Sequence, residues 1–249
     1  MTVLEGGPRL LGREEPFAGE EVQAAFESEG IRVRTDSRVT AAHRNGAVTI
    51  SLADGETIEG DELFVSVGRR PATADLGLET IGLEPGSAIE VDDSLRAVGV
   101  DGSWLHAVGD VNGRAPLTHM GKYQARLAAD AILGRDVNAF GDMRAVPRVT
   151  FTDPQVAAVG LTEADAEGQG LLIRSVTTPT GGVAGAYTKG NSISGTSKLV
   201  VEEQCRVLVG ATFTGPDMQE LLHSATVAIV GEVTLDTPLA RGSVVSDGE

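Results

Sequence analysis

A glycine and an acid close a short apolar run in the middle of the chain, in a setting where they could bind a ligand. The run Leu105–Val108 ends at Gly109-Asp110, and a polar turn then leads to a helix predicted to begin at Thr118. Glycine lets a ligand approach the backbone, and ligands of layered α/β folds lie beyond the carboxyl ends of strands. The Asp110 carboxylate could accept hydrogen bonds from sugar or polyol hydroxyls. The N–H groups at the helix start could face an electron-rich group.

The same two residues also have a simpler interpretation. From the local sequence alone, a turn that only leads the chain into the next helix is favoured for Gly109-Asp110. The choice between the two depends on the elements that surround the pair.

Length and composition exclude several classes of protein. The chain has 249 residues, 41% of them hydrophobic, which is enough for one large domain or two ordinary ones. The net charge of −16 disfavours binding to nucleic acids or to anionic membranes. We find no apolar run long enough to span a membrane and no leader-like start, so we expect a cytoplasmic protein. A single cysteine permits no disulfide within the chain, and we see no cluster of metal ligands.

Hydrophobic periodicity predicts a strand-rich first part of the chain. One helix is expected at 20–29, with Gly30 as its end, and the hairpin turn Asp54-Gly55 joins two of the strands. The expected strands are 2–5, 31–35, 38–42, 48–52, 57–59, the buried run 63–67 and the run 105–108.

The rest of the chain predicts a helix and then a differently built domain. Residues 118–133 have the period of a helix, and Gly134 is well placed to end it. The pattern breaks over 135–146, where we place a domain boundary. Beyond it, strands followed by a packed helix indicate an α+β domain. Its expected elements are strands 149–151 and 156–159, the hairpin 199–202 with 207–211, and a helix at 219–230.

Three stretches, in this order, resemble one enzyme family. They are "ELFVSVGRRPAT" (62–73), "LHAVGDVNGRAPLTHMGKYQARLAA" (105–129) and "VPRVTFTDPQVAAVGLTEADA" (146–166). The family is that of the class I flavin-dependent pyridine nucleotide-disulfide oxidoreductases, which includes dihydrolipoamide dehydrogenases, glutathione reductases and mercuric reductases. The resemblance runs from residue 1 to about 237 and corresponds to the C-terminal part of a family member.

The resemblance implies a cofactor for the Gly109-Asp110 pair. In the family this Gly-Asp ends a strand of the FAD domain, and its Asp binds the ribityl chain of FAD. The turn Leu117-Thr118-His119 would place backbone N–H groups near the pyrimidine end of the flavin ring. The start of the helix would then stabilise negative charge on a reduced flavin.

The resemblance also implies a site for NAD(P). Glu5 ends a strand similar to the second strand of the family's NAD(P) domain, where an acid bonds the adenosine ribose. It would favour NAD over NADP, although Arg9 and Arg13 weaken this preference. A solvated acid at a strand end is the alternative interpretation of Glu5. Gly68 would lie on the nicotinamide side of the site.

The chain departs from the family at several points. The printed sequence contains neither the phosphate loop G-x-G-x-x-G nor the redox pair C-x4-C. Cys205 cannot replace that pair, and we expect it to be a small packed residue of the C-terminal hairpin. The last residues, 238–249, do not resemble the family's ending. We therefore name no catalytic residue.

The resulting prediction is an α/β protein with three parts. A partial Rossmann-like NAD(P) domain (1–70) and the C-terminal part of an FAD domain (71–140) precede an α+β dimerisation domain (146–249), with an atypical tail from 238. The expected function is transfer of a hydride from NAD(P)H to FAD and of electrons on to a disulfide or small-molecule acceptor, in a homodimer. The alternative is a non-catalytic remnant that dimerises and binds cofactor weakly at most, so whether the chain is itself an enzyme stays open.

Overall fold

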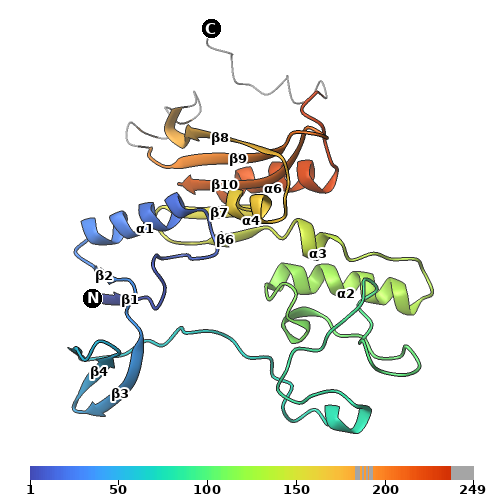
Figure 1. Ribbon diagram of the computed structural model, residues 1–249, viewed down its shortest axis with the longest axis horizontal. Helices are drawn as coiled ribbons and strands as arrows, with labels where there is room; N and C mark the ends of the chain where they lie inside the picture. The colour runs from blue at the N-terminus through green and yellow to red at the C-terminus, as the bar shows by residue number, and fades with distance from the viewer. Residues whose placement is uncertain (183–185, 187, 189, 191–192, 237–249) are drawn as a thin grey trace. The chain divides into compact units, whose positions relative to one another are not determined.

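The computed structural model describes residues 1–182, 186, 188, 190 and 193–236. The chain divides into two compact units (Figure 1). The first combines Met1–Ser66 with Val149–Glu249, and the second is Val67–Arg148. The three-part division expected from the sequence follows motifs rather than contacts and stays a prediction. The tail 238–249 lies outside the described residues.

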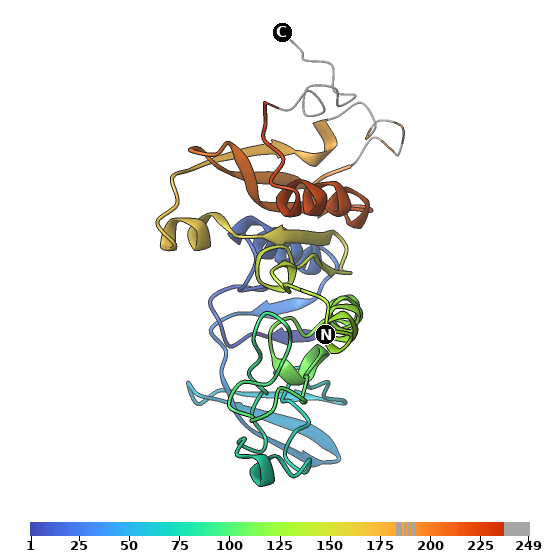
Figure 2. The same ribbon diagram turned by 90° about the vertical axis from the view of Figure 1, so that its right-hand side faces the viewer.

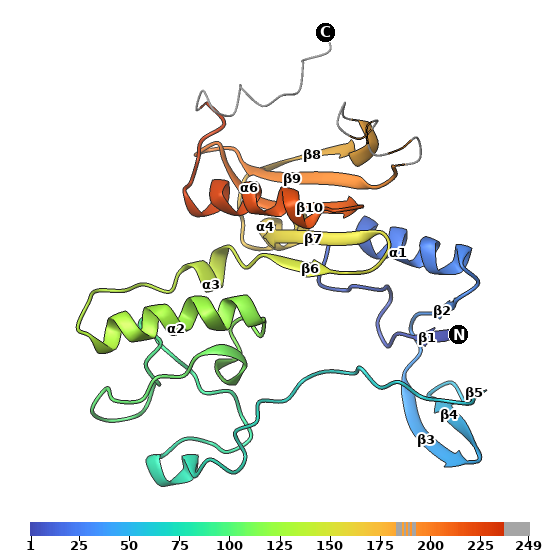
Figure 3. The same ribbon diagram turned by 180° about the vertical axis from the view of Figure 1, so that it is seen from behind.

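The main sheet of the first unit has five strands in the order β6-β7-β10-β9-β8, which can be followed in Figure 3. The antiparallel hairpin of β9 and β10 confirms the expected pairing of 199–202 with 207–211. The strands are β6 (Arg148–Thr150), β7 (Gln155–Gly160), β8 (Ile173–Pro179), β9 (Thr196–Glu202) and β10 (Val207–Gly215). The edge strand β8 was not predicted, because its polar residues are mostly exposed and hide the strand period.

A helix covers this sheet. Helix α6 (Gln219–Val230) has the predicted bounds and runs along the sheet in Figure 2. It buries Leu222, Ala225 and Ile229, whose spacing of three and four places them on one helical face. This part also contains the short helix α4 (Glu163–Gly168) and the 3₁₀ turn η3 (Thr180–Gly182).

The N-terminal part of the first unit begins with a β-α-β arrangement. Strands β1 (Thr2–Leu4) and β2 (Arg32–Arg34) pair in parallel, and α1 (Pro16–Ser28) connects them. The helix begins earlier than its expected start at 20, because Pro16 suits the first turn of a helix. Three antiparallel strands follow as a second, separate sheet: β3 (Val39–Asn45), β4 (Ala47–Leu52) and β5 (Thr57–Gly60).

The predicted buried strand at 63–67 is not formed, and this prediction was wrong. The side chains of Phe64 and Val67 are 92% and 91% exposed, and residues 61–70 contain no strand. An apolar β-branched run becomes a strand only when a neighbouring strand and a covering layer are present. The described part of the chain supplies neither to this segment.

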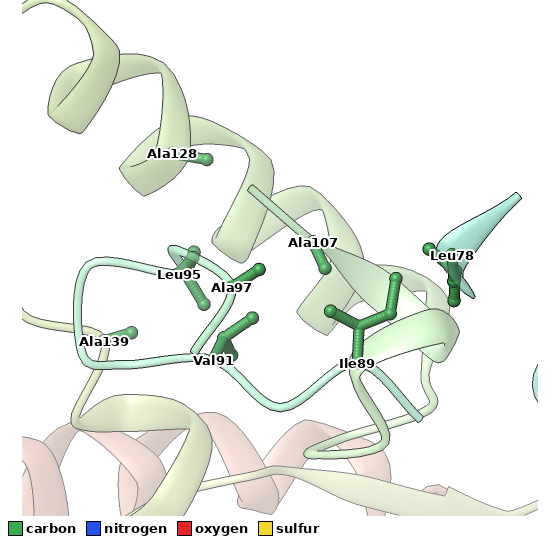
Figure 4. Packing of buried hydrophobic residues seen from close by; sticks show 8 residues of the cluster. All are labelled: Leu78, Ile89, Val91, Leu95, Ala97, Ala107, Ala128 and Ala139. Atoms are coloured by element: carbon green, nitrogen blue, oxygen red, sulfur yellow. The ribbon is translucent and has the colours of Figure 1, made fainter. Parts of the chain in front are cut away.

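The second unit is built around one helix and a small apolar core. Its elements are η1 (Leu78–Ile81), η2 (Gly109–Asn112), α2 (Thr118–Ile132) and α3 (Gly141–Arg144). Helix α2 agrees with the predicted 118–133, and Gly134 follows it with a φ of 77°. The run 105–108 forms a single antiparallel bridge, from His106 to Arg96, instead of the predicted strand. Figure 4 shows the core: Leu78, Ile89, Val91, Leu95, Ala97, Ala107, Ala128 and Ala139.

Cys205 is exposed in the turn between β9 and β10, so the expectation of a packed cysteine was wrong. The neighbouring Glu202 carboxylate raises the pKa of the Cys205 thiol, which keeps it protonated and weakly nucleophilic.

Within the described residues, none of the helices has both the length and the apolar character needed to cross a membrane.

Candidate flavin-side site

The backbone turns sharply at Gly109. Val108 is extended, with φ −129° and ψ 147°, whereas Gly109 has a φ of 76° and begins η2. Gly113 ends η2 with a φ of 71°. Residues that carry a side chain rarely adopt such positive backbone φ values. The change of direction from the extended run to η2 therefore requires glycine at its start.

A second glycine lets this turn lie against α2. A Cβ atom built on Gly121 would be 3.4 Å from the Cα of Gly109, and one built on Gly109 would be 3.8 Å from the Cα of Gly121. The two backbones therefore approach each other closely, with no side chain between them. The Gly-Asp pair is positioned by α2 as well as by the run that precedes it.

Gln124 of α2 binds the turn directly. Its Oε1 accepts hydrogen bonds from the backbone N of Gly109 at 2.7 Å and from Nδ2 of Asn112 at 2.9 Å. Its Nε2 donates to Oδ2 of Asp142 at 2.9 Å. Asn112 Nδ2 also donates to the carbonyl of Ala107 at 3.0 Å, which ties η2 back to the extended run.

This buried network was missed in the sequence. Gln124 has no exposed surface and Asp142 is 2% exposed, and charged or amide side chains are buried in this way only when they are bonded. Arg114 pairs with Asp142, Nη1 to Oδ1, at 3.4 Å, and its Nη2 donates to the carbonyl of Val91 at 2.7 Å. A glutamine among the apolar positions of the helix 118–133 was the available signal.

The charge of Asp142 is costly where it lies. Burial raises the pKa of the Asp142 carboxyl above its ordinary value, although the Arg114 guanidinium and the bond from Gln124 act in the opposite direction. Arg114 and Gln124 therefore offset part of the cost that burial imposes on the charged form of this carboxyl.

Asp110 points away from this network. Its side chain is 61% exposed, and Oδ2 lies 3.7 Å from Nη1 of Arg69. The same Nη1 donates to the carbonyl of Pro116 at 2.6 Å. An ion pair between two largely exposed side chains is weak and easily exchanged for another partner. The Asp110 carboxylate is therefore accessible to a ligand.

The start of α2 has no side-chain cap. Leu117 is the extended N-cap residue, and its own N–H bonds the carbonyl of Ala115 at 2.7 Å. Thr118 and His119 are exposed. The imidazole Nε2 of His119 lies 2.7 Å from the carbonyl of Pro147, and because a carbonyl only accepts, this nitrogen carries the proton. Of the three predicted residues, Thr118 and His119 can still offer backbone N–H groups.

Gly68 and Glu5 were predicted on the pyridine nucleotide side. Gly68 has a φ of 137° with open space around it, and it precedes Arg69, the partner of Asp110. Glu5 follows β1 in the first unit, and its Oε1 accepts a bond of 2.7 Å from the N of Gly7. One carboxylate oxygen of Glu5 is therefore used within its own turn.

An apolar pocket of about 500 Å³ lies beside the run 105–108. Ile89, Trp104 and His106 are among its lining residues, and Trp104 is 61% exposed. The Nε2 of His106 is buried with no hydrogen-bond partner among the described residues. The sequence did not indicate this pocket.

The arrangement around Asp110 fits one side of a flavin nucleotide. An accessible carboxylate suits the hydroxyls of a polyol, and an uncapped helix start suits an electron-rich ring edge. Over the described ranges, we find no group of three or more histidine, cysteine or acidic side chains that could hold a metal ion.

Two family models match the chain. Residues 1–125 match the family described as pyridine nucleotide-disulphide oxidoreductase, and residues 146–242 match the dimerisation domain of the same family. Members of this family are flavoproteins that use FAD and a pyridine nucleotide.

Individual relatives agree with these matches. The chain is 31% identical to a dihydrolipoyl dehydrogenase of Mycobacterium leprae over 247 residues, which are 97% of this chain and 52% of the relative. It is 32% identical to a dihydrolipoyl dehydrogenase of Staphylococcus aureus over 235 residues, or 92% of this chain and 49% of the relative. The chain thus spans about half the length of these curated relatives.

Solved structures show the same fold. LpdA of Mycobacterium tuberculosis matches with a TM-score of 0.84 and 26% identity, over 98% of this chain and 52% of that one. The flavoprotein disulfide reductase RclA of Escherichia coli matches with a TM-score of 0.82 and 24% identity, over 100% of this chain and 56% of that one. With both family models matched in order, this α/β chain belongs to the class I pyridine nucleotide-disulfide oxidoreductase family.

Proposed function

We propose that this chain forms the ribityl side of an FAD site in an NAD(P)H-dependent oxidoreductase. The observation that carries the proposal is the Gly109-Asp110 turn, which is fixed to α2 on its inner side and leaves the Asp110 carboxylate 61% exposed on its outer side. The family match supplies the class of cofactor.

The chain's own residues would bind and orient the cofactor. FAD, when bound, accepts a hydride from NAD(P)H and passes electrons on to a disulfide or a small-molecule acceptor. Asp110 would exchange Arg69 for ribityl hydroxyls. The backbone N–H groups of Thr118 and His119, with Leu117 before them, would face the pyrimidine end of the ring, where the helix start favours electron density.

The pyridine nucleotide side is assigned to two residues. Glu5 keeps one oxygen for an adenosine ribose, which supports NAD over NADP. Arg9, which would weaken that preference, donates to the carbonyl of Leu11 at 3.2 Å within its own loop. Gly68, with open space around it, would lie by the nicotinamide.

The C-terminal domain would make the protein a homodimer. Val227 and Val230 of α6 are 53% and 43% exposed and, three positions apart, share one helical face. Such a face is suited to an interface. The net charge of −16 disfavours anionic partners, so we propose neither a nucleic-acid nor a membrane partner. We also propose that the protein is cytoplasmic.

One observation favours the alternative function. The side chain of Phe64 is 92% exposed, and this uncovered apolar run supports a chain that dimerises and binds FAD weakly at most. In that case the dimerisation domain would be the functional part.

Titration of the full chain with FAD separates the two functions. We expect flavin fluorescence to be quenched by the wild type and the Kd to rise about tenfold or more in Asp110→Ala, because a charged hydrogen-bond partner is lost. Asp101→Ala, at an exposed acid of the same unit, is the matched control and should not change the Kd. Equal binding by all three proteins would contradict the assignment of Asp110, and a wild type that does not bind would favour the alternative.

A further inference from the structure

The amide of Gln124 holds both ends of η2. One oxygen, Oε1, accepts from the first residue of the turn, Gly109, and from the last, Asn112. Gln124 has no exposed surface, so no water competes for these bonds. The geometry of the turn therefore depends on the direction in which this single amide points.

Asp142 sets that direction. A carboxylate only accepts hydrogen bonds, so the group that faces Oδ2 of Asp142 must be the NH2 end of the Gln124 amide, and Oε1 must face the turn. Asp142 is itself held by Arg114, whose other Nη is bound to the carbonyl of Val91. An amide rotated by half a turn would present NH2 to the N–H of Gly109.

The position of Gln124 on α2 explains why it can reach the turn. Gly121 and Gln124 are three residues apart and thus on the same helical face. Gly121 leaves space for the backbone of Gly109, and Gln124 supplies the bond to it. Together they direct the N–H of Gly109 inward, so that the next residue, Asp110, is directed outward.

We propose that Gln124, oriented by Asp142, is a positioning residue that fixes the Gly109 peptide and thereby presents the Asp110 carboxylate to the flavin nucleotide. This inference rests on the proposed function, and it adds two buried side chains that do not touch the ligand. A network that served only the stability of the core would affect the whole unit and not the turn in particular.

The replacement Gln124→Glu makes the proposal specific. It keeps the shape and the accepting Oε1 but puts a second carboxyl against Asp142, which already faces the Arg114 guanidinium, the Asp93 carboxylate and the Tyr123 hydroxyl. When the introduced carboxyl and that of Asp142 share a proton, the hydrogen bonds to the turn and to Asp142 are kept. When both carboxyls are charged, they repel each other. Gln124→Leu keeps a similar volume and removes the bonds at every pH.

Amide hydrogen exchange at Gly109, measured by NMR in the cofactor-free chain, is the first test. We expect the Gly109 amide to be protected from exchange in the wild type. In Gln124→Leu it should exchange about tenfold or more faster, with the exchange rate of the Ala128 amide on α2 as the internal reference. In Gln124→Glu we expect wild-type protection at about pH 5.5 and loss of protection at about pH 8.

Thr73→Val is the matched control. Thr73 is also completely buried in the second unit, and its Oγ1 makes a single bond of 2.7 Å to the carbonyl of Ser87. This variant should lose stability without a selective change at Gly109. A Gly109 amide that exchanges freely in the wild type, or changes no more in Gln124→Leu than in Thr73→Val, would overturn the proposal.

FAD binding links the turn to the ligand. The Kd should rise about tenfold in Gln124→Leu at both pH values, and in Gln124→Glu only at the higher one. Unchanged Kd values in variants that lose Gly109 protection would overturn the positioning role. If the wild type itself does not bind FAD, the proposed function fails and the ligand part of this proposal fails with it. The exchange data then still decide whether Gln124 and Asp142 fix the turn.

Discussion

The Nζ of Lys198 lies 2.8 Å from Oε2 of Glu15, although the two residues are 183 positions apart in the chain. Only 10% of the Lys198 side chain and 3% of the Glu15 side chain are exposed. Lys198 also donates to Oε2 of Glu163 at 2.5 Å, and Oε1 of Glu15 accepts from the backbone N of Glu163 at 2.8 Å. The start of α1 is therefore tied to β9 and to the start of α4.

Lys198→Met should destabilise the first unit by about 3–5 kcal/mol, because it leaves the buried Glu15 carboxylate without its cation. Urea unfolding of the full chain measures this loss. Arg174→Met is the control, since the Arg174 side chain, paired with Glu203, is 71% exposed and such a pair is worth about 1 kcal/mol or less. Losses of similar size in the two variants would contradict the view that the Lys198 pair is buried.

Stability should fall in acid partly through Glu163. The hydrogen bond from Lys198 is the largest cause that lowers the pKa of Glu163 below its ordinary value of 4.5. A carboxyl with a lowered pKa in the folded state stabilises the protein above its unfolded pKa, and this contribution is lost as the pH falls through the folded pKa. Glu163→Gln should flatten the acid side of a plot of unfolding free energy against pH. Parallel acid limbs for the variant and the wild type would disprove this.

The alkaline side should depend on Lys198. Its hydrogen bonds to Glu15 and Glu163 raise the Lys198 pKa above its ordinary 10.5, although burial alone would lower it. A raised lysine pKa stabilises the folded state below the unfolded pKa, and this contribution disappears as the pH rises through the folded pKa. Unfolding in alkali should therefore be less steep in Lys198→Met than in the wild type.

Gly109→Ala tests the backbone of the candidate site. At a φ of 76° an added Cβ costs about 1–2 kcal/mol, and it would lie 3.8 Å from the Cα of Gly121, in ordinary van der Waals contact. Gly86→Ala is the matched control, because Gly86 has a φ of 80° and nothing within 4 Å of an added Cβ. Both variants should lose similar stability by thermal unfolding, but only Gly109→Ala should lose FAD affinity. A loss of affinity in both would indicate a general effect of destabilisation.

Phe64→Asp tests the exposed apolar run. An apolar side chain that is 92% exposed, next to other apolar residues, favours association between molecules. We expect light scattering at increasing protein concentration to show less association between molecules in Phe64→Asp than in the wild type. Glu62→Gln, in the same segment but at a polar position, should behave as the wild type does. Equal association of Phe64→Asp and the wild type would show that the exposed run does not promote association between molecules.

Elements with local signals could be predicted from the sequence, and elements that depend on partners could not. Helix α6 was predicted over 219–230 because its apolar period is contained within the helix itself. The run 63–67 has an equally clear strand pattern, yet strand formation requires hydrogen-bond partners elsewhere in the protein. The strand predicted from this local pattern is therefore not formed.

The residues of the candidate site show the same contrast between local patterns and contacts made by packing. Gly109-Asp110 could be found because a glycine and an acid at the end of an apolar run form a local pattern. Gln124 and Asp142 are 18 positions apart, on α2 and α3, and only the packing of these helices brings them together. The exposure of Cys205 likewise depends on where the turn between β9 and β10 lies, which its small apolar side chain does not indicate.

The proposed FAD site is tested most directly by the visible absorption spectrum of the full chain after equilibration with FAD and removal of unbound flavin. We expect a bound-flavin spectrum at a ratio near one flavin per chain for the wild type and a lower ratio for Asp110→Ala. A colourless protein after the same treatment would contradict the proposed FAD site and would leave dimerisation as the remaining proposal for the function of this chain.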